Sequence, residues 1–157
     1  MFAIDKEILA EMRKGSDRAC AIVGHAHIEE ECKAALRALL RNDATAFNEA
    51  TEWNFLQSHA ARVNLLYLIE AIDKPARDDL KLLTGVRNEF AHNSQVTKFS
   101  SPSVAKHLSK IKLLNVTTNV RNLFSGAKEV SLRRQFEYCV GNAVAILRQC
   151  APRVAGE

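Results

Sequence analysis

The side chains best suited to chemistry in this 157-residue sequence lie within one short segment, Arg87-Asn88-Glu89-Phe90-Ala91-His92. A guanidinium can neutralise a phosphate group, and an imidazole can act as general acid or base near neutral pH. Together they could cleave RNA without a metal, because the neighbouring 2′-hydroxyl of the ribose can serve as nucleophile. Under this nuclease hypothesis, Arg87 and His92 are the catalytic residues.

The position of Arg87 on its predicted helix sets a condition on that hypothesis. Arg87 falls within a broad apolar face, and burying an unpaired guanidinium costs several kcal/mol. It must therefore meet a carboxylate, carbonyls or an anion. Arg87 and His92 lie about 140° apart on an intact helix, whereas Asn88 and His92 lie one turn apart and can touch. Arg87 and His92 reach one target only if the helix ends at His92, the Arg87 side chain extends along its stem, or a second subunit completes the site.

A purely structural interpretation of the same residues stays open. Arg87 would then pair with a buried acid such as Glu29 or Glu70. His92 would close the helix near its negative end, where a cation is favoured.

A metal site is the next chemistry to consider. His25 and Glu29 are spaced i,i+4, and His27 lies three and four residues before Glu30 and Glu31. Each pairing supplies only two ligands, and surface pairs of this kind are common, so we expect no metal and no other cofactor. His59 and His107 have no ionisable partner in the sequence and are predicted to be exposed polar residues.

The elements that position these side chains are predicted to be helices throughout. Pro and Gly are scarce, and 157 residues suit one domain spanning 1–157, with a core that needs no disulfide or structural metal. The fold class predicted is all-α: a single-domain bundle of six or seven helices, mostly antiparallel. The apolar periodicity and capping residues predict helices over residues 2–14, 17–41, 58–72, 75–92, 102–114 and 132–150, with a short one near 46–50. Residues 116–120 are the only strand-like segment.

Finer features follow from the same periodicity. The last helix is expected to pack antiparallel to its neighbours. Gly24 and Gly141 lie inside helices, where glycine costs about 1 kcal/mol relative to alanine, and therefore indicate close helix approach. The four cysteines lack metal-ligand spacing and are expected to be reduced thiols in the core.

Charge and hydropathy limit the classes of binding partner and the cellular compartment that the sequence allows. The net charge of +4 is uneven: residues 1–92 carry 12 Lys/Arg against 15 Asp/Glu, and residues 93–157 carry 10 against 3. The basic half could face a nucleic acid or an acidic protein, although its charges are scattered as on a solvated face. No secretion signal is visible, and no apolar run approaches the roughly 20 residues that span a bilayer. We expect a cytoplasmic protein without membrane contact.

The motif and several longer segments resemble known families. Arg-Asn-x-x-x-His at a helix end resembles the R-x4-6-H motif of HEPN domains, helical bundles that include dimeric, metal-independent ribonucleases and non-catalytic relatives. More of the chain resembles the HEPN-like mannitol operon repressor family, through residues 18–24 (RACAIVG), 28–31 (IEEE), 58–69 with ARV at 61–63, and 80–92 (LKLLTGVRNEFAH). These segments cover roughly residues 16–150 when the final helix is counted.

The resemblance implies roles for individual residues. Glu29 would be the acidic partner of Arg87, because the resembling families place an acid on this helix facing the motif helix. Arg62 matches a resembling segment and would join the same polar cluster as Glu29, Arg87, Asn88 and His92.

Two functions remain open on these grounds. The first is a negative regulator of transcription of the mannitol-repressor type, a homodimer that acts through a protein or RNA partner. The second is a metal-independent HEPN-type endoribonuclease. Direct DNA binding is not favoured: the candidate recognition helix at 101–114 carries Lys106, His107, Lys110 and Lys112 but lacks a preceding partner helix with a tight turn.

Overall fold

The computed structural model describes residues 6–53, 55–114 and 130–150, and these parts of the chain are helical with no strand. This confirms the predicted all-helical bundle. The predicted strand-like residues 116–120 lie outside the described residues. No helix among the described residues is long and apolar enough to cross a membrane.

The helices are α1 (Lys6–Arg13), α2 (Asp17–Leu39), α3 (Ala44–Asn48), the π-helix η1 (Glu49–Trp53), α4 (His59–Leu68), α5 (Lys74–His92), α6 (Pro102–Lys110) and α8 (Leu132–Cys150).

Side-chain caps fix where several helices begin. Ser16 accepts a hydrogen bond from the backbone N–H of the third helical residue of α2, and Ser58 does the same for α4. Asp73 caps α5 in this way, directly before Lys74 and Pro75. Each cap satisfies a backbone donor that has no partner within the helix. The starts predicted from the sequence for these helices are therefore correct to within one residue.

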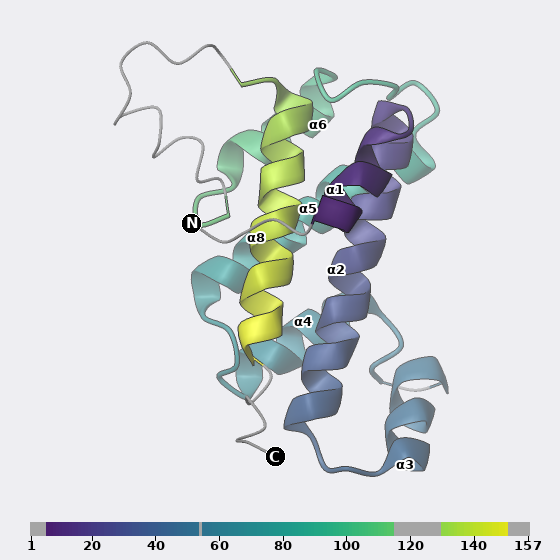
Figure 1. Ribbon diagram of the computed structural model, residues 1–157, viewed down its shortest axis with the longest axis vertical. Helices are drawn as coiled ribbons and strands as arrows, with labels where there is room; N and C mark the ends of the chain where they lie inside the picture. Colours follow the sequence, from purple (N-terminus) through teal and green to yellow (C-terminus); the bar gives the residue numbers. More distant parts are fainter. Residues whose placement is uncertain (1–5, 54, 115–129, 151–157) are drawn as a thin grey trace.

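The centre of the bundle is the pair α2 and α8, which lie side by side (Figure 1). Arg133 at the start of α8 pairs with Asp17 at the start of α2 at 3.1 Å, and Arg148 near the end of α8 pairs with Glu31 at 2.7 Å. The two helices therefore run parallel, whereas the periodicity of the sequence predicted that α8 packs antiparallel to its neighbours. Helices far apart in sequence are free to pack in either direction, because no short loop constrains them.

Close contact between these helices depends on Gly24. A Cβ placed there would lie 2.8 Å from Met12 Cε and 3.1 Å from atoms of Phe136 and Val140. The sequence prediction of close approach at this glycine is confirmed. The core around it holds three of the four cysteines, which are free thiols, and burial raises the pKa of Cys20, Cys32 and Cys139 to about 12.

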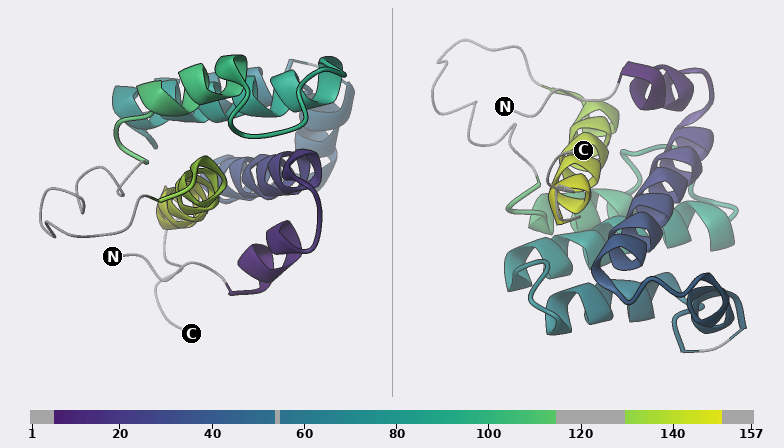
Figure 2. Two further views of the ribbon diagram at one scale, coloured as in Figure 1. Left: turned by 90° about the horizontal axis from the view of Figure 1, so that it is seen from above. Right: turned by 60° about the horizontal axis from the view of Figure 1, so that its bottom comes forward.

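The remaining helices form layers on either side of α2 and α8. Seen from above, α5 and α6 lie together on one side and α1 lies on the other (Figure 2). The segments that flank α5 contact both ends of α8: Cys150 at the end of α8 donates its thiol to the carbonyl of Ala71 just before α5, and Phe136 near the start of α8 stacks on Phe99 beyond the end of α5.

Two helices are shorter than predicted, and each has a local reason. α4 ends at Leu68 rather than near residue 72, because Glu70 adopts a φ of 62°, which helices exclude. α6 ends at Lys110 rather than at Leu114. The buried carboxylate of Asp79 accepts hydrogen bonds from the backbone N–H groups of residues 112, 113 and 114, at 2.7 to 3.1 Å, and so fixes them in a turn.

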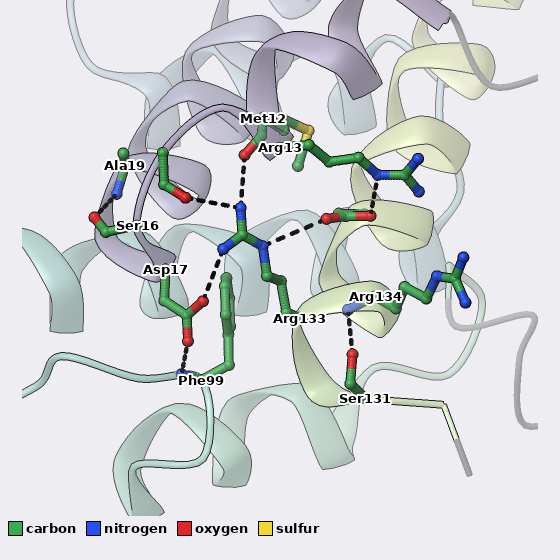
Figure 3. A network of polar contacts seen from close by, with 11 residues as sticks. Met12, Arg13, Ser16, Asp17, Ala19, Phe99, Ser131, Arg133 and Arg134 are labelled. Carbon is green, nitrogen blue, oxygen red and sulfur yellow. Dashed lines mark hydrogen bonds and ion pairs between the residues drawn. The ribbon is translucent and has the colours of Figure 1, made fainter. Parts of the chain in front are cut away.

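A polar network closes the end of the bundle where α1, α2 and α8 meet (Figure 3). The Arg133 guanidinium lies 3.1 Å from Asp17 and 3.5 Å from Glu137, and it donates to the carbonyls of Met12 and Gly15. Asp17 also accepts the backbone N–H of Phe99. The network therefore ties the segment that follows α5 to the start of α2.

Candidate functional site

The carboxyl-terminal half of α5 is held against α2 by a second arginine. Arg18 donates to the backbone carbonyls of residues 93, 94 and 96, at 3.0 to 3.5 Å. These carbonyls belong to the segment directly after α5, next to the helix end that carries partial negative charge. Arg18 therefore fixes the helix end that carries the Arg87 to His92 segment.

Arg87 lies half-buried on α5, and its Nη1 donates to Asn88 Oδ1 at 3.0 Å. Among the described residues, no carboxylate forms an ion pair with this guanidinium. Glu29 contacts His25 instead, and Glu70 lies in the turn before α5, about 20 Å along the helix axis from Arg87. The direct pairing of Arg87 with Glu29 or Glu70 is therefore not formed in this structure.

His92 is the last residue of α5 and is exposed. Its imidazole makes no hydrogen bond or ion pair with another side chain in the part of the chain that the structure describes. The helix stays intact from Arg87 to His92, so the two side chains point about 140° apart. One protomer does not direct both groups at the same point.

A buried polar cluster lies one turn before Arg87, where α2, α4 and α5 meet. His25 of α2 contacts Thr84 of α5 through Nε2, at 3.0 Å, and its Nδ1 lies 3.4 Å from Glu29 Oε1. The His25 ring packs edge-on against the ring of His59, with centroids 4.8 Å apart. His59 is the first residue of α4, so this pair joins two helices.

The environment keeps both histidines neutral. Burial, with smaller effects of His59 and Arg87, lowers the pKa of His25 from 6.5 to about 3. Burial, with smaller effects of Arg62 and Arg87, lowers the pKa of His59 to about 4.

The hydrogen bonds of Thr84 decide the tautomer of His25. Thr84 Oγ1 donates its one hydroxyl proton to the carbonyl of Leu80 at 3.0 Å, so in the contact with His25 the ring donates from Nε2 and Thr84 Oγ1 accepts. Glu29 Oε1 lies 3.4 Å from the other ring nitrogen, Nδ1. Glu29 therefore lies beside His25 rather than in an ion pair with Arg87.

His59 differs from His25 because both of its ring nitrogens are buried without a hydrogen-bond partner among the described residues. Only 9% of this residue is exposed. The sequence prediction that His59 is an exposed polar residue is wrong. Burial of a single polar residue depends on what the opposing helix presents, and here His25 of α2 covers the ring.

Arg62 lies on the same helix but serves the backbone. Its guanidinium donates to the carbonyls of residues 51, 56 and 57, at 2.7 to 3.1 Å, and so holds the segment between η1 and α4. It remains close enough to His59 to lower the pKa of that imidazole. The structure thus brings Glu29, Arg62 and Arg87 around the histidine pair, while Asn88 and His92 lie at the exposed side of α5.

The other histidines have separate roles. His27 contacts Glu11 of α1 at 2.9 Å rather than Glu30 or Glu31. His107 is half-buried on α6, and its ring lies against Gly85 of α5. Within residues 6–53, 55–114 and 130–150, no three His, Cys, Asp or Glu side chains gather closely enough to hold a metal ion.

No protein-family model and no curated protein matches this sequence. Two chains of known structure share its fold. One, from the MtlR–HPr complex of Escherichia coli, gives a TM-score of 0.68 at 14% identity, over 90% of this chain and 96% of that chain. The other is YggD of Shigella flexneri 2a str. 2457T, described as a possible transcriptional regulator, with a TM-score of 0.60 at 13% identity over 93% of both chains. At these identities the likeness concerns the fold alone, and the chain therefore has an MtlR-like helical fold along nearly its whole length.

Proposed function

We propose that this chain is a regulatory protein of the mannitol operon repressor type, a negative regulator of transcription that acts through a protein partner. The observation that carries this proposal is the fold match, which extends over nearly all of both chains to a structure solved as a complex with HPr. The second match is described as a possible transcriptional regulator. Such a regulator would work in the cytoplasm.

The arrangement of α6 supports a mode of action that does not depend on reading DNA. Gly85 of α5 faces His107 of α6, and Asp79 earlier in α5 binds the backbone beyond the end of α6. The two helices therefore lie antiparallel along each other, whereas a helix-turn-helix crosses at about 90–120°. Lys106 and Lys110 are exposed on α6, but α5, the helix that precedes α6 among the described residues, lies along it rather than across it as a helix-turn-helix requires.

A titration tests this proposal directly. Purified chain is titrated with purified Escherichia coli HPr by isothermal calorimetry, and in parallel with duplex DNA at low salt by gel shift. Saturable binding of HPr with no DNA shift is the expected result. No heat with HPr would overturn HPr as the partner. A sequence-specific DNA shift with a steep salt dependence would overturn action through a protein partner alone.

A metal-independent endoribonuclease is the second candidate. The observation that favours it is Arg87, a half-buried guanidinium without a carboxylate among the described residues, five positions before the exposed His92. Because these side chains diverge around the helix, the nuclease requires a homodimer in which Arg87 of one subunit and His92 of the other meet at one phosphate. Arg87 would neutralise that phosphate, and His92 would transfer the proton.

Incubation with mixed RNA in excess chelator separates the nuclease from the regulator. Under the nuclease hypothesis, the chain cleaves RNA, and both Arg87→Ala and His92→Ala abolish cleavage. His27→Ala is the matched control, because His27 is paired with Glu11 on another helix. Light scattering of the same samples measures the mass of the assembly. Absence of cleavage at high protein concentration, or a monomer that still cleaves, would remove this candidate.

A further inference from the structure

His59 poses a problem that neither proposed function solves. Both ring nitrogens are buried and have no hydrogen-bond partner among the described residues. Only 9% of the residue is exposed. A buried polar atom without a partner costs about 1–3 kcal/mol, and most buried polar atoms in proteins avoid it. A phenylalanine at this position would fill similar space without that cost. The imidazole therefore indicates a partner outside the described residues.

The groups around His59 show what charge that partner would carry. Arg62 on α4 and Arg87 on α5 both lie close enough to lower the pKa of the imidazole. α2 contributes His25, which is neutral, and Glu29, whose carboxylate faces His25 Nδ1. His59 is also the first residue of α4, where the helix carries partial positive charge. The local field thus favours an anion.

Arg87 has donors to spare for such an anion. A guanidinium carries five N–H donors, and the one contact of Arg87 with a side chain among the described residues is through Nη1 to Asn88. Thr84, which binds His25, lies one helical turn before Arg87, so Arg87 lies on the same side of α5 as the histidine pair. Arg62, by contrast, is committed to three backbone carbonyls.

We propose that His59, Arg87 and the amino end of α4 bind a small oxyanion of the phosphate class. The Arg87 fork supplies paired donors to two oxygens of the anion, and one nitrogen of His59 supplies a further bond. Helix amino ends bind such groups through the same combination of backbone donors and dipole. This site goes beyond the proposed regulatory function and does not require HPr or RNA.

Proton uptake distinguishes anion binding at this buried site from anion binding at the protein surface. A negative charge beside a buried imidazole stabilises its protonated form and raises its pKa. Anion binding should therefore bring a proton to His59 below about pH 6.5, the ordinary pKa of histidine. Sulfate is the probe that isolates this effect, because sulfate does not titrate in this range and phosphate does.

The test is calorimetric titration of the full chain with sodium sulfate, then with phosphate and methyl phosphate. Each titration is run near pH 6 in two buffers with different heats of ionisation. We expect saturable sulfate binding with proton uptake, together with a shift of the His59 ring signals in nitrogen-15 NMR spectra. Sodium chloride at matched ionic strength should give neither effect. Tighter binding of methyl phosphate than of inorganic phosphate would identify an esterified phosphate as the source, and the reverse order would identify the free ion.

Two variants and one control make the result decisive. His59→Phe and Arg87→Gln should each weaken sulfate binding at least about tenfold, the loss expected for a hydrogen bond to a charged group. His59→Phe should also abolish proton uptake. His27→Gln, on the outer side of α2, should bind as the parent does. Sulfate binding that is absent, that survives in both variants, or that brings no proton would overturn the site, whatever the outcome with HPr or RNA.

Discussion

Acidification should destabilise this bundle through its two buried histidines. Lowering the pH from about 7.5 to about 5 is expected to remove roughly 4 kcal/mol from the free energy of unfolding. A typical domain has a total of about 5–15 kcal/mol, so the effect is a large fraction of the stability. The cause is that His25 and His59 are neutral in the folded chain and protonated in the unfolded one.

The magnitude follows from the shifted pKa values. The ordinary histidine pKa is 6.5, and burial lowers it to about 3 for His25 and about 4 for His59. Between these limits the unfolded chain binds a proton at each site and the folded chain does not. Stability is then fully present above pH 6.5 and falls by about 1.36 kcal/mol per pH unit and per group below it. At about pH 5 each histidine accounts for about 2 kcal/mol.

Urea denaturation followed by circular dichroism measures this dependence. The free energy of unfolding is determined at several pH values in buffers free of phosphate and sulfate. His59→Phe should halve the slope of stability against pH and should raise stability at neutral pH, because two unpaired buried nitrogens are removed. His27→Gln, which changes a histidine paired with Glu11, is the control and should keep the full slope.

Two results would refute the reasoning. Stability that stays constant between about pH 7.5 and 5 would mean that the histidines are accessible to protons in the folded chain. An unchanged slope in His59→Phe would mean that other groups cause the loss.

Three further substitutions test contacts described above, each by urea denaturation. Asp79→Ala should cost about 3 kcal/mol or more, because three backbone N–H groups lose their acceptor. Asp78→Ala, which removes a partly exposed carboxylate paired with Lys74, should have a much smaller effect, and equal effects would contradict the role of Asp79. Arg133→Ala should lower the free energy of unfolding by about 2 kcal/mol, because it removes the centre of the network in Figure 3. Arg134 is its exposed neighbour and serves as the control; a similar loss of stability in Arg134→Ala would argue against the role of the network. Gly24→Val should cost about 1–3 kcal/mol through overpacking between α2 and α8, and a neutral result would show that these helices can separate at no cost.

Local signals made much of the fold predictable. Ser16, Ser58 and Asp73 are short polar residues before apolar periodic runs, and each caps a helix in the structure. Capping depends on residues within one turn, so a single sequence contains the information. The end of α6 was not predictable in this way, because it depends on Asp79, which lies 33 residues before Lys112.

The candidate site was predictable only in part, for the same reason. The helical periodicity identified Arg87 as a charge on an apolar face, and the structure places it half-buried on α5. The partner expected for it, Glu29, contacts His25 instead. The contact between His25 and His59 joins helices whose relative position no local pattern encodes. Of this pair, His59 had no ionisable partner in the sequence and His25 had only Glu29 by spacing, so the contact between the two rings required the tertiary structure.

The parallel pairing of α2 with α8 also constrains the order in which this protein can fold. α2 ends at Leu39 and α8 begins at Leu132, so the central interface joins two distant parts of the chain. At about 5–20 residues per second, a ribosome needs on the order of 10 s to synthesise the intervening segment. During that interval the apolar face of α2 that packs on α8 lacks its partner, and such long-range closure slows folding. We therefore expect the growing chain to bind chaperones most strongly before α8 leaves the ribosome.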